Sequence, residues 1–143
     1  DGTVRVGGYS FYKNDKLVHL TFAATVEEIG DMAFFGCGNM WTVWLPDSLR
    51  TIGNDAFSYC GSLSPIMYIP SSVTDIGHHA FFSCRSLKEF YMGAESEKSI
   101  NLGESWLPKS IKAGIVNKTP KPVYGKTLQD ALDEKDRLDN QNK

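Results

Sequence analysis

The sequence has no run of basic residues, no long apolar segment and few cysteines. Its 143 residues carry a formal net charge of −2, so a basic patch that binds nucleic acid or an anionic membrane surface is not expected. No stretch approaches the roughly 20 apolar residues of a membrane-spanning helix, so no membrane insertion is expected. The chain begins at Asp1 without Met or a signal-like apolar region, and we expect a processed or trimmed amino terminus.

Sequence signatures of catalysis are also missing. No Gly-rich phosphate loop and no Gly-x-Ser-x-Gly elbow occurs, and no Ser or Cys nucleophile is placed beside a histidine. His78 and His79 are adjacent, so on a helical turn they would point about 100° apart, and His19 lies in another unit. We therefore predict that the protein is not an enzyme and has no cofactor and no metal site.

The sequence does contain a repeat of 23 or 24 residues. Four units start with an apolar residue and Gly, carry an aromatic residue five positions after the start, and have Cys, or Asn in the first unit, eight positions after it. An apolar alternation follows in every unit. The glycines are Gly7, Gly30, Gly53 and Gly77; the aromatics are Phe11, Phe34, Phe57 and Phe81; the next column is Asn14, Cys37, Cys60 and Cys84. This repetition predicts coils that bury an apolar core by stacking.

Each unit predicts a strand, a Gly corner, a short helical turn and a return. The Gly fits a corner where the neighbouring coil approaches closely, and Asp31 and Asn54 fit the N-cap of a helical turn. Stacked at roughly 4.8 Å, the strands would form a parallel sheet of about four members. The strand segments are His19 to Phe22, Thr42 to Leu45, Ile66 to Ile69 and Glu89 to Met92.

The string IGNDAFSYCGSLSPIMYIPSSVTDIG, residues 52–77, resembles the 23-residue leucine-rich repeats of the BspA-like class. The resemblance covers about residues 4–92. It implies an α/β fold, a right-handed solenoid with a short-stranded parallel sheet on the concave side and short helical turns on the convex side. It also implies a secreted or cell-surface location and a role in protein binding and adhesion in bacteria.

The C-terminal third departs from the repeat. The stretch Trp106 to Lys112 echoes Trp44 to Arg50, which predicts a truncated fifth coil that begins a cap, within a solenoid over residues 1–113. Residues 114–143 would form a C-terminal cap or linker. Within them, Thr127 to Leu138 starts with a Thr-x-x-Asp capping pattern and predicts a short amphipathic helix. That helix either docks as part of the cap or links to another domain.

The three cysteines share one column, so adjacent pairs could approach the roughly 6 Å Cα separation of a disulfide. The count is odd, and Asn14 takes the same place in the first unit. Cysteine in a small inward position behaves as a compact hydrophobic residue. We therefore expect Cys37, Cys60 and Cys84 to be free buried thiols.

The candidate binding site is a column of side chains on the outer face of the predicted strands. If Leu20 and its equivalents point inward, their successors point outward and line the open concave face. The predicted ligand-binding residues are Thr21, Trp44, Tyr68 and Tyr91, with His19, Thr42, Ile66 and Glu89 two positions earlier. Tryptophan and tyrosine are enriched at binding hot spots, which favours a binding role. Alternatively, the aromatics stabilise one another as cross-strand pairs or are covered by the C-terminal segment.

Three functions fit such a column. The first is a non-catalytic protein-binding module of a bacterial cell-surface or secreted adhesin-like protein, with a protein ligand on a host or neighbouring cell. The second is a carbohydrate-binding surface, because aromatic rings also stack on sugars. The third is a passive structural spacer, in which the column is covered. The exposed strand edges at the ends of a short solenoid predict a monomer or weak self-association.

Overall fold

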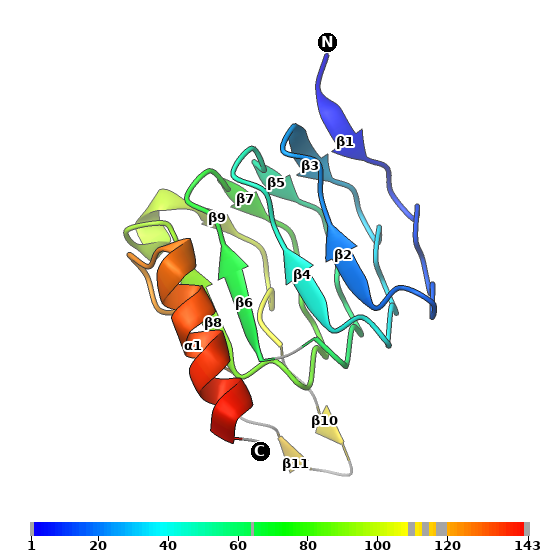
Figure 1. The fold of residues 1–143 in the computed structure, drawn as a ribbon. Coiled ribbons are helices and arrows are strands. Elements are labelled where there is room, and N and C mark those ends of the chain that lie inside the picture. Colours follow the sequence, from blue (N-terminus) through cyan, green and yellow to red (C-terminus); the bar gives the residue numbers. More distant parts are fainter. Residues whose placement is uncertain (1, 64, 109–110, 113–114, 117–119, 142–143) are drawn as a thin grey trace.

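The structure, a computed structural model, describes residues 2–63, 65–108, 111–112, 115–116 and 120–141. Over these residues the chain winds into coils that stack along one axis, and a single helix, α1 (Leu128–Gln141), lies against one side of the stack (Figure 1). Each coil contributes one short strand to each of two sides. The solenoid architecture predicted from the repeat is therefore confirmed.

One side of the solenoid is a five-stranded parallel sheet in the order β1-β3-β5-β7-β9. Its strands are β1 (Val4–Val6), β3 (Val26–Ile29), β5 (Thr51–Ile52), β7 (Asp75–Ile76) and β9 (Asn101–Leu102). The sequence analysis did not predict this sheet. Most of its strands have only two residues before the Gly corner, which is too short for the period-2 pattern that reveals a strand.

The other side consists of the four strands that the apolar alternation predicted: β2 (His19–Thr21), β4 (Thr42–Trp44), β6 (Ile66–Ile69) and β8 (Glu89–Met92). They run parallel, and Leu20 pairs with Val43 as Met67 pairs with Phe90. They form two pairs, β2-β4 and β6-β8, in place of one sheet of four. Pro65 immediately precedes β6 and has no N–H to donate toward β4, which explains why the ladder breaks there.

The segments after the Gly corners are successive turns, so the predicted short helices and their N-caps are wrong. In the second coil, Met32 and Gly36 have positive φ values of 55° and 72°. The N–H groups of Met32, Phe34 and Gly36 donate to the next coil, at the carbonyls of Asn54, Ala56 and Ser58. A helix would use these groups within its own turns, whereas here they join neighbouring coils.

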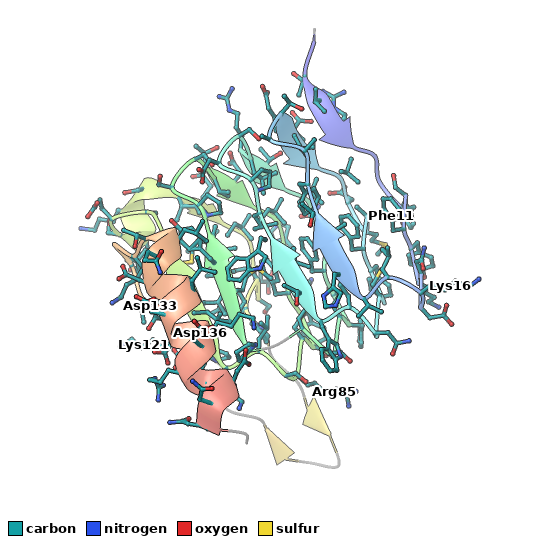
Figure 2. All side chains as sticks on the ribbon, in the orientation of Figure 1. Phe11, Lys16, Arg85, Lys121, Asp133 and Asp136 are labelled. Atoms are coloured by element: carbon teal, nitrogen blue, oxygen red, sulfur yellow. The ribbon has the colours of Figure 1, made fainter. Side chains whose placement is uncertain are left out.

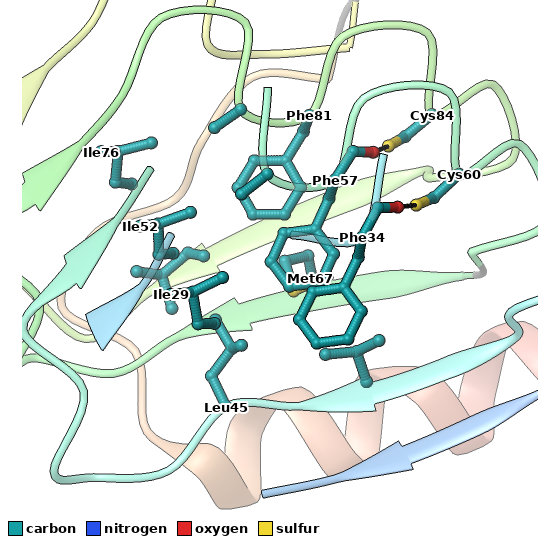
Figure 3. Packing of buried hydrophobic residues seen from close by; sticks show 14 of the residues in the cluster. Ile29, Phe34, Leu45, Ile52, Phe57, Cys60, Met67, Ile76, Phe81 and Cys84 are labelled. Carbon is teal, nitrogen blue, oxygen red and sulfur yellow. Dashed lines mark hydrogen bonds between the residues drawn. The ribbon is translucent and has the colours of Figure 1, made fainter. Parts of the chain in front are cut away.

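The core is built from the repeated aromatic and cysteine columns. The rings of Phe34, Phe57 and Phe81 are fully buried and nearly parallel, with centroids 5.2 and 5.4 Å apart (Figure 3). Trp106 meets the last ring edge-on at a centroid distance of 6.4 Å. Trp106 thus closes the stack at its C-terminal end.

A fifth coil is present, but it is aligned differently from the prediction. Its strand is β9, which pairs with β7, and Leu102-Gly103 takes the place of Ile76-Gly77. Phe81 N–H donates to the carbonyl of Trp106, so Trp106 lies in a turn and is not the equivalent of Trp44 in a strand. The antiparallel strands β10 (Ile111–Lys112) and β11 (Ile115–Val116) follow. The predicted boundary between residues 113 and 114 lies outside the described residues.

The C-terminal segment docks on the solenoid, as one of the two predicted alternatives required. Val123 exchanges backbone hydrogen bonds with Phe90 and Met92 of β8, and so covers the edge of that strand. The capping pattern that starts α1 is confirmed: Asp130 N–H donates to Thr127 Oγ1, and Thr127 N–H donates to Asp130 Oδ2. No helix in the described part of the chain is long and apolar enough to span a membrane.

The glycine corners should tolerate no side chain. A Cβ at Gly53 would lie 2.6 Å from Asp31 N, so we expect Gly53→Ala to destabilise the protein by about 1–3 kcal/mol, the usual cost of overpacking. Gly38→Ala is the matched control, because a Cβ there meets nothing within 4 Å; it should change stability by less than about 0.5 kcal/mol. Urea denaturation of both variants measures the difference. Equal effects would contradict the close approach of the coils.

Candidate ligand-binding face

The predicted column of outward side chains is present on the strands of the second side. Thr21 pairs with Trp44 across β2 and β4, and Tyr68 pairs with Tyr91 across β6 and β8. The neighbouring inward residues Val43, Met67 and Phe90 are buried in the core, which fixes the outward direction of their successors. We call Thr21, Trp44, Tyr68 and Tyr91 the aromatic column.

Helix α1 covers the part of this face that β6 and β8 provide, so the prediction that the whole face is open is wrong. Tyr68 is only 9% exposed and Ile66 7%, and both pack against the fully buried Ala131 of α1. Trp44 and Tyr91 are half-buried at the margins of this small cluster. Sequence reasoning weighed this covering as an alternative, and the structure realises it for half of the column.

The contacts between the C-terminal segment and the column are polar as well as apolar. Tyr68 Oη donates a long hydrogen bond of 3.4 Å to the carbonyl of Lys126, and the Lys126 ammonium lies 5.2 Å from the centre of the Tyr91 ring. Burial raises the pKa of the Tyr68 phenol, and the carboxylates of Asp47 and Asp130 raise this pKa further. Burial likewise raises the pKa of Tyr91.

The half of the face that β2 and β4 provide remains accessible. His19 and Thr21 are exposed, while Thr42 and Trp44 are half-buried. Trp41, which directly precedes β4, is 63% exposed and is thus the most exposed of the large apolar side chains. Glu89, the remaining predicted site residue, is half-buried at the start of β8.

A pocket of about 330 Å³ lies between this open half and the end of α1. Lys135 and Asp139 of the helix form an ion pair of 2.6 Å at its wall. Both side chains keep part of their surface exposed, so they can still bond to a ligand. The pocket is lined by Trp41, Thr42, Ser62, Lys135 and Asp139.

Sequence reasoning missed a second set of aromatic side chains, on the turns. Tyr12 stacks on Phe35 at 5.3 Å, Phe35 contacts Tyr59 at 5.3 Å, and Tyr59 contacts Phe82 at 5.7 Å. We call these four residues the turn row. Tyr12 is 42% and Tyr59 51% exposed, so the row is accessible to a ligand. A signal was available, since an aromatic residue directly follows the repeated Phe in three of the four units.

Polar side chains at the Gly corners join successive coils. Asn54 N–H donates to Asp31 Oδ1, His78 N–H to Asn54 Oδ1, and Glu104 N–H to His78 Nδ1, at 2.7–2.8 Å. Asp31 and Asn54 therefore cap the next coil and not a helix of their own. His78, predicted as an ordinary surface histidine, has a structural role in this series.

The cysteines are free and buried, as predicted. Each thiol donates to the carbonyl of a phenylalanine in the coil before it, at 3.0–3.1 Å: Cys37 to Phe11, Cys60 to Phe34 and Cys84 to Phe57 (Figure 3 shows the last two). Burial raises the pKa of Cys84 to about 12. Among the described residues, no group of three or more His, Cys, Asp or Glu side chains could hold a metal ion.

Stacked coils with repeated Ile-Gly, Phe and Cys columns define a leucine-rich-repeat solenoid, a fold that generally mediates protein interactions and is generally non-catalytic. The model of the BspA type leucine-rich repeat region matches residues 2–106 in six copies. The chain belongs to this family.

Two solved structures are similar to the chain. A leucine-rich repeat protein from Bacteroides ovatus is 30% identical over 61% of this chain and 28% of its own, with a TM-score of 0.48. The T. pallidum leucine-rich repeat protein is 29% identical over 73% of this chain and 64% of its own, with a TM-score of 0.49. This chain thus spans less than two thirds of either. No curated protein sequence matches it.

The buried thiols should be inert in the native protein. We expect Cys60 and Cys84, both 0% exposed, to react with a disulfide reagent at pH 8 only as fast as the chain unfolds, because the thiolate is the nucleophile and burial disfavours it. Absorbance of the released thiol, followed with and without 6–8 M urea (about the usual denaturing range), measures the two rates. Rapid reaction of all three thiols without urea would contradict the buried column.

Docking of α1 should depend on the small residue at its centre. Ala131→Glu places a carboxylate between Ile66 and Tyr68, so we expect the helix to leave the face and its amides to lose hydrogen-exchange protection. Leu132→Glu is the matched control, since Leu132 is 36% exposed and has the same helix neighbours. If both variants keep the protection of residues 128–141, Ala131 does not hold the helix in place.

Proposed function

We propose that this chain is a non-catalytic protein-binding module and that its ligand docks on the accessible half of the strand face, beside α1. The observation that carries the proposal is the division of the aromatic column. Tyr68 is buried by a helix of the same chain, while Thr21 and the neighbouring His19 remain exposed. The face thus accepts an amphipathic helix at one end and leaves comparable surface free at the other.

The chemistry of the free half supports a protein ligand. Trp44 is partly exposed and Trp41 is 63% exposed, and tryptophan is among the residues that contribute most at protein interfaces. Hydroxyl groups of Thr21 and Thr42 supply polar contacts beside the rings, as expected at the rim of an interface. The proposed contact residues are Trp44, Thr21, Thr42, His19 and Trp41, with Tyr91 and Glu89 at the margin.

The family gives the proposed setting. BspA-type repeats are associated with bacterial surface proteins. We propose that the chain acts in a bacterial cell-surface or secreted adhesin-like protein whose ligand is a protein of a host or neighbouring cell. Of the predicted site residues, Tyr68 and Ile66 would contact such a ligand only if α1 left the face.

A second candidate function is carbohydrate binding at the pocket beside Trp41. An exposed indole beside the hydroxyl of Thr42 and the carboxylate of Asp139 offers a sugar both a stacking surface and hydrogen-bond partners. Sugar binding needs Trp41 and Asp139, whereas a protein interface centred on the strands needs Trp44. A passive spacer needs none of the three.

Substitution of Trp44 tests the first proposal. The unmodified protein is screened by biolayer interferometry against extracellular-matrix proteins and an array of glycans. For a protein ligand found in this way, we expect Trp44→Ala to weaken binding at least about tenfold, since a hot-spot truncation costs 2 kcal/mol or more. Circular dichroism confirms that the variant folds.

Two matched variants locate the ligand. Tyr59→Ala removes an exposed ring from the turn row and should leave the affinity unchanged. Trp41→Ala and Asp139→Asn should matter most for a glycan. Loss of binding in Tyr59→Ala together with full binding in Trp44→Ala would place the ligand on the turn row and refute the proposed face.

A further inference from the structure

Coil 1, residues 4–20, is the end of the stack that no other described element covers (Figures 1 and 2). Phe11 stacks on Phe34 at 5.2 Å with an interplanar angle of 3°, and its other side faces solvent, so Phe11 is 37% exposed. The equivalent Phe34, Phe57 and Phe81 are fully buried. An apolar core column is therefore open at one end only, because Trp106 closes the other.

The corner glycines explain what their column requires. A Cβ on any of the four stacked glycines would lie 2.4–2.6 Å from backbone atoms of the coil before it, such as Gly8 N for Gly30 and Asn54 N for Gly77. None of the four has a positive φ. The column therefore requires glycine because a preceding coil approaches it, and not because of its own backbone conformation. The four are Gly30, Gly53, Gly77 and Gly103.

Gly7 occupies the same column in coil 1 but has no coil before it. A Cβ there would meet only Ser10 Oγ, at 3.3 Å, and the φ of Gly7 is not positive. Within the described chain nothing requires glycine at this position. A coil stacked on the free side of coil 1 would require it, for the same reason as at Gly30.

The hydrogen-bonding groups of coil 1 specify what could stack there. Its N–H groups at Tyr9, Phe11 and Lys13 donate to coil 2, at the carbonyls of Asp31, Ala33 and Phe35. The equivalent carbonyls of coil 1 accept a hydrogen bond from no described residue; they belong to Gly8, Ser10 and Tyr12. The turns of this face thus offer acceptors and need N–H donors in return.

This polarity argues against a second copy of the chain as the occupant. Two coil-1 faces placed against each other would bring carbonyl against carbonyl in the turns, without donors. The opposite end of another copy does not fit either, because its Phe column ends on the edge of Trp106 and Phe90. A coil of the same repeat supplies three N–H donors and a phenylalanine ring in the required register.

We propose that the free face of coil 1 is a docking surface for one more coil of this repeat, joined to the chain ahead of Val4. That coil donates its turn N–H groups to Gly8, Ser10 and Tyr12, covers the Phe11 ring and passes close over Gly7. This surface is distinct from the strand face of the proposed ligand-binding function, and neither depends on the other.

The test adds such a coil and asks whether Gly7 then becomes essential. The segment Gly30–Ile52 is duplicated between Val6 and Gly7, which preserves an apolar-Gly junction on both sides. We expect the extended chain to unfold in one transition at a higher temperature than the original. Gly7→Ala should leave the midpoint of the original chain unchanged and lower that of the extended chain by several degrees.

Gly30→Ala is the control, because its corner is covered in both chains and it should lower both midpoints. The proposal is overturned if the extended chain fails to fold, if the added coil shows no hydrogen-exchange protection, or if Gly7→Ala is tolerated equally in both. Sedimentation equilibrium of the original chain gives an independent check. A dimer that Phe11→Asp dissociates would show that a second copy occupies the face and would likewise overturn the proposal.

Discussion

Adjacent coils are joined most closely where the corner Gly N–H donates to the apolar residue that precedes the corner in the coil before. Gly30 bonds in this way to Val6, Gly53 to Ile29 and Gly77 to Ile52, each at 2.8 Å. The contact leaves no room for a Cβ, so it sets both the residue type at the corner and the distance between coils. Every other repeated contact in the solenoid is made at that distance.

The core columns follow from this spacing. Phenylalanine rings repeat at 5.2–5.4 Å, slightly more than the roughly 4.8 Å between strands, because neighbouring rings must stack face to face. The thiol of each cysteine reaches the carbonyl of a phenylalanine one coil earlier, and in the same way each corner side chain reaches the next N–H. A change at one corner would therefore disturb several columns together, so the stability of each coil depends on its neighbours.

Repetition also limits the chemistry that the molecule can support. A catalytic site brings unlike groups together at one point, whereas a stacked repeat places like groups in rows. The rows here are phenylalanines and thiols inside and aromatics, hydroxyls and amides outside. Such rows suit an extended contact with a partner, and the family to which the chain belongs generally serves that purpose.

The sequence predicted those parts of the structure that local pattern determines. The strands at Leu20, Val43, Met67 and Phe90, the buried free cysteines and the capped helix after Thr127 were predicted correctly. The turns were not, because positive φ at residues such as Asp55 and Tyr59 leaves no trace in composition. The match of Trp106 to Trp44 misled, since a short echo of letters outweighed the true signal, Leu102 followed by Gly103.

The candidate site was predictable in its register but not in its exposure. Period-2 alternation fixes which side chains point outward, and the column from Thr21 to Tyr91 follows from it. What covers that column depends on tertiary packing, which the sequence of α1 leaves open. Leu128, Ala131, Leu132 and Leu138 all lie toward one side of that helix, yet only Ala131 and Leu138 are buried. The small Ala131 allows the helix to approach Tyr68, which a count of apolar residues cannot reveal.

The helix therefore defines the site as well as reducing it. By covering Tyr68 and Ile66 it removes the most apolar part of the face from solvent, which keeps the remaining aromatic surface small enough for a protein that is exposed to water. At the same time its Lys135 and Asp139 form one wall of the pocket beside Trp41. A ligand on the accessible half would contact a strand face on one side and a charged helix end on the other. The irregular C-terminal segment thus provides the one place on this solenoid where unlike groups converge beside a repeated surface.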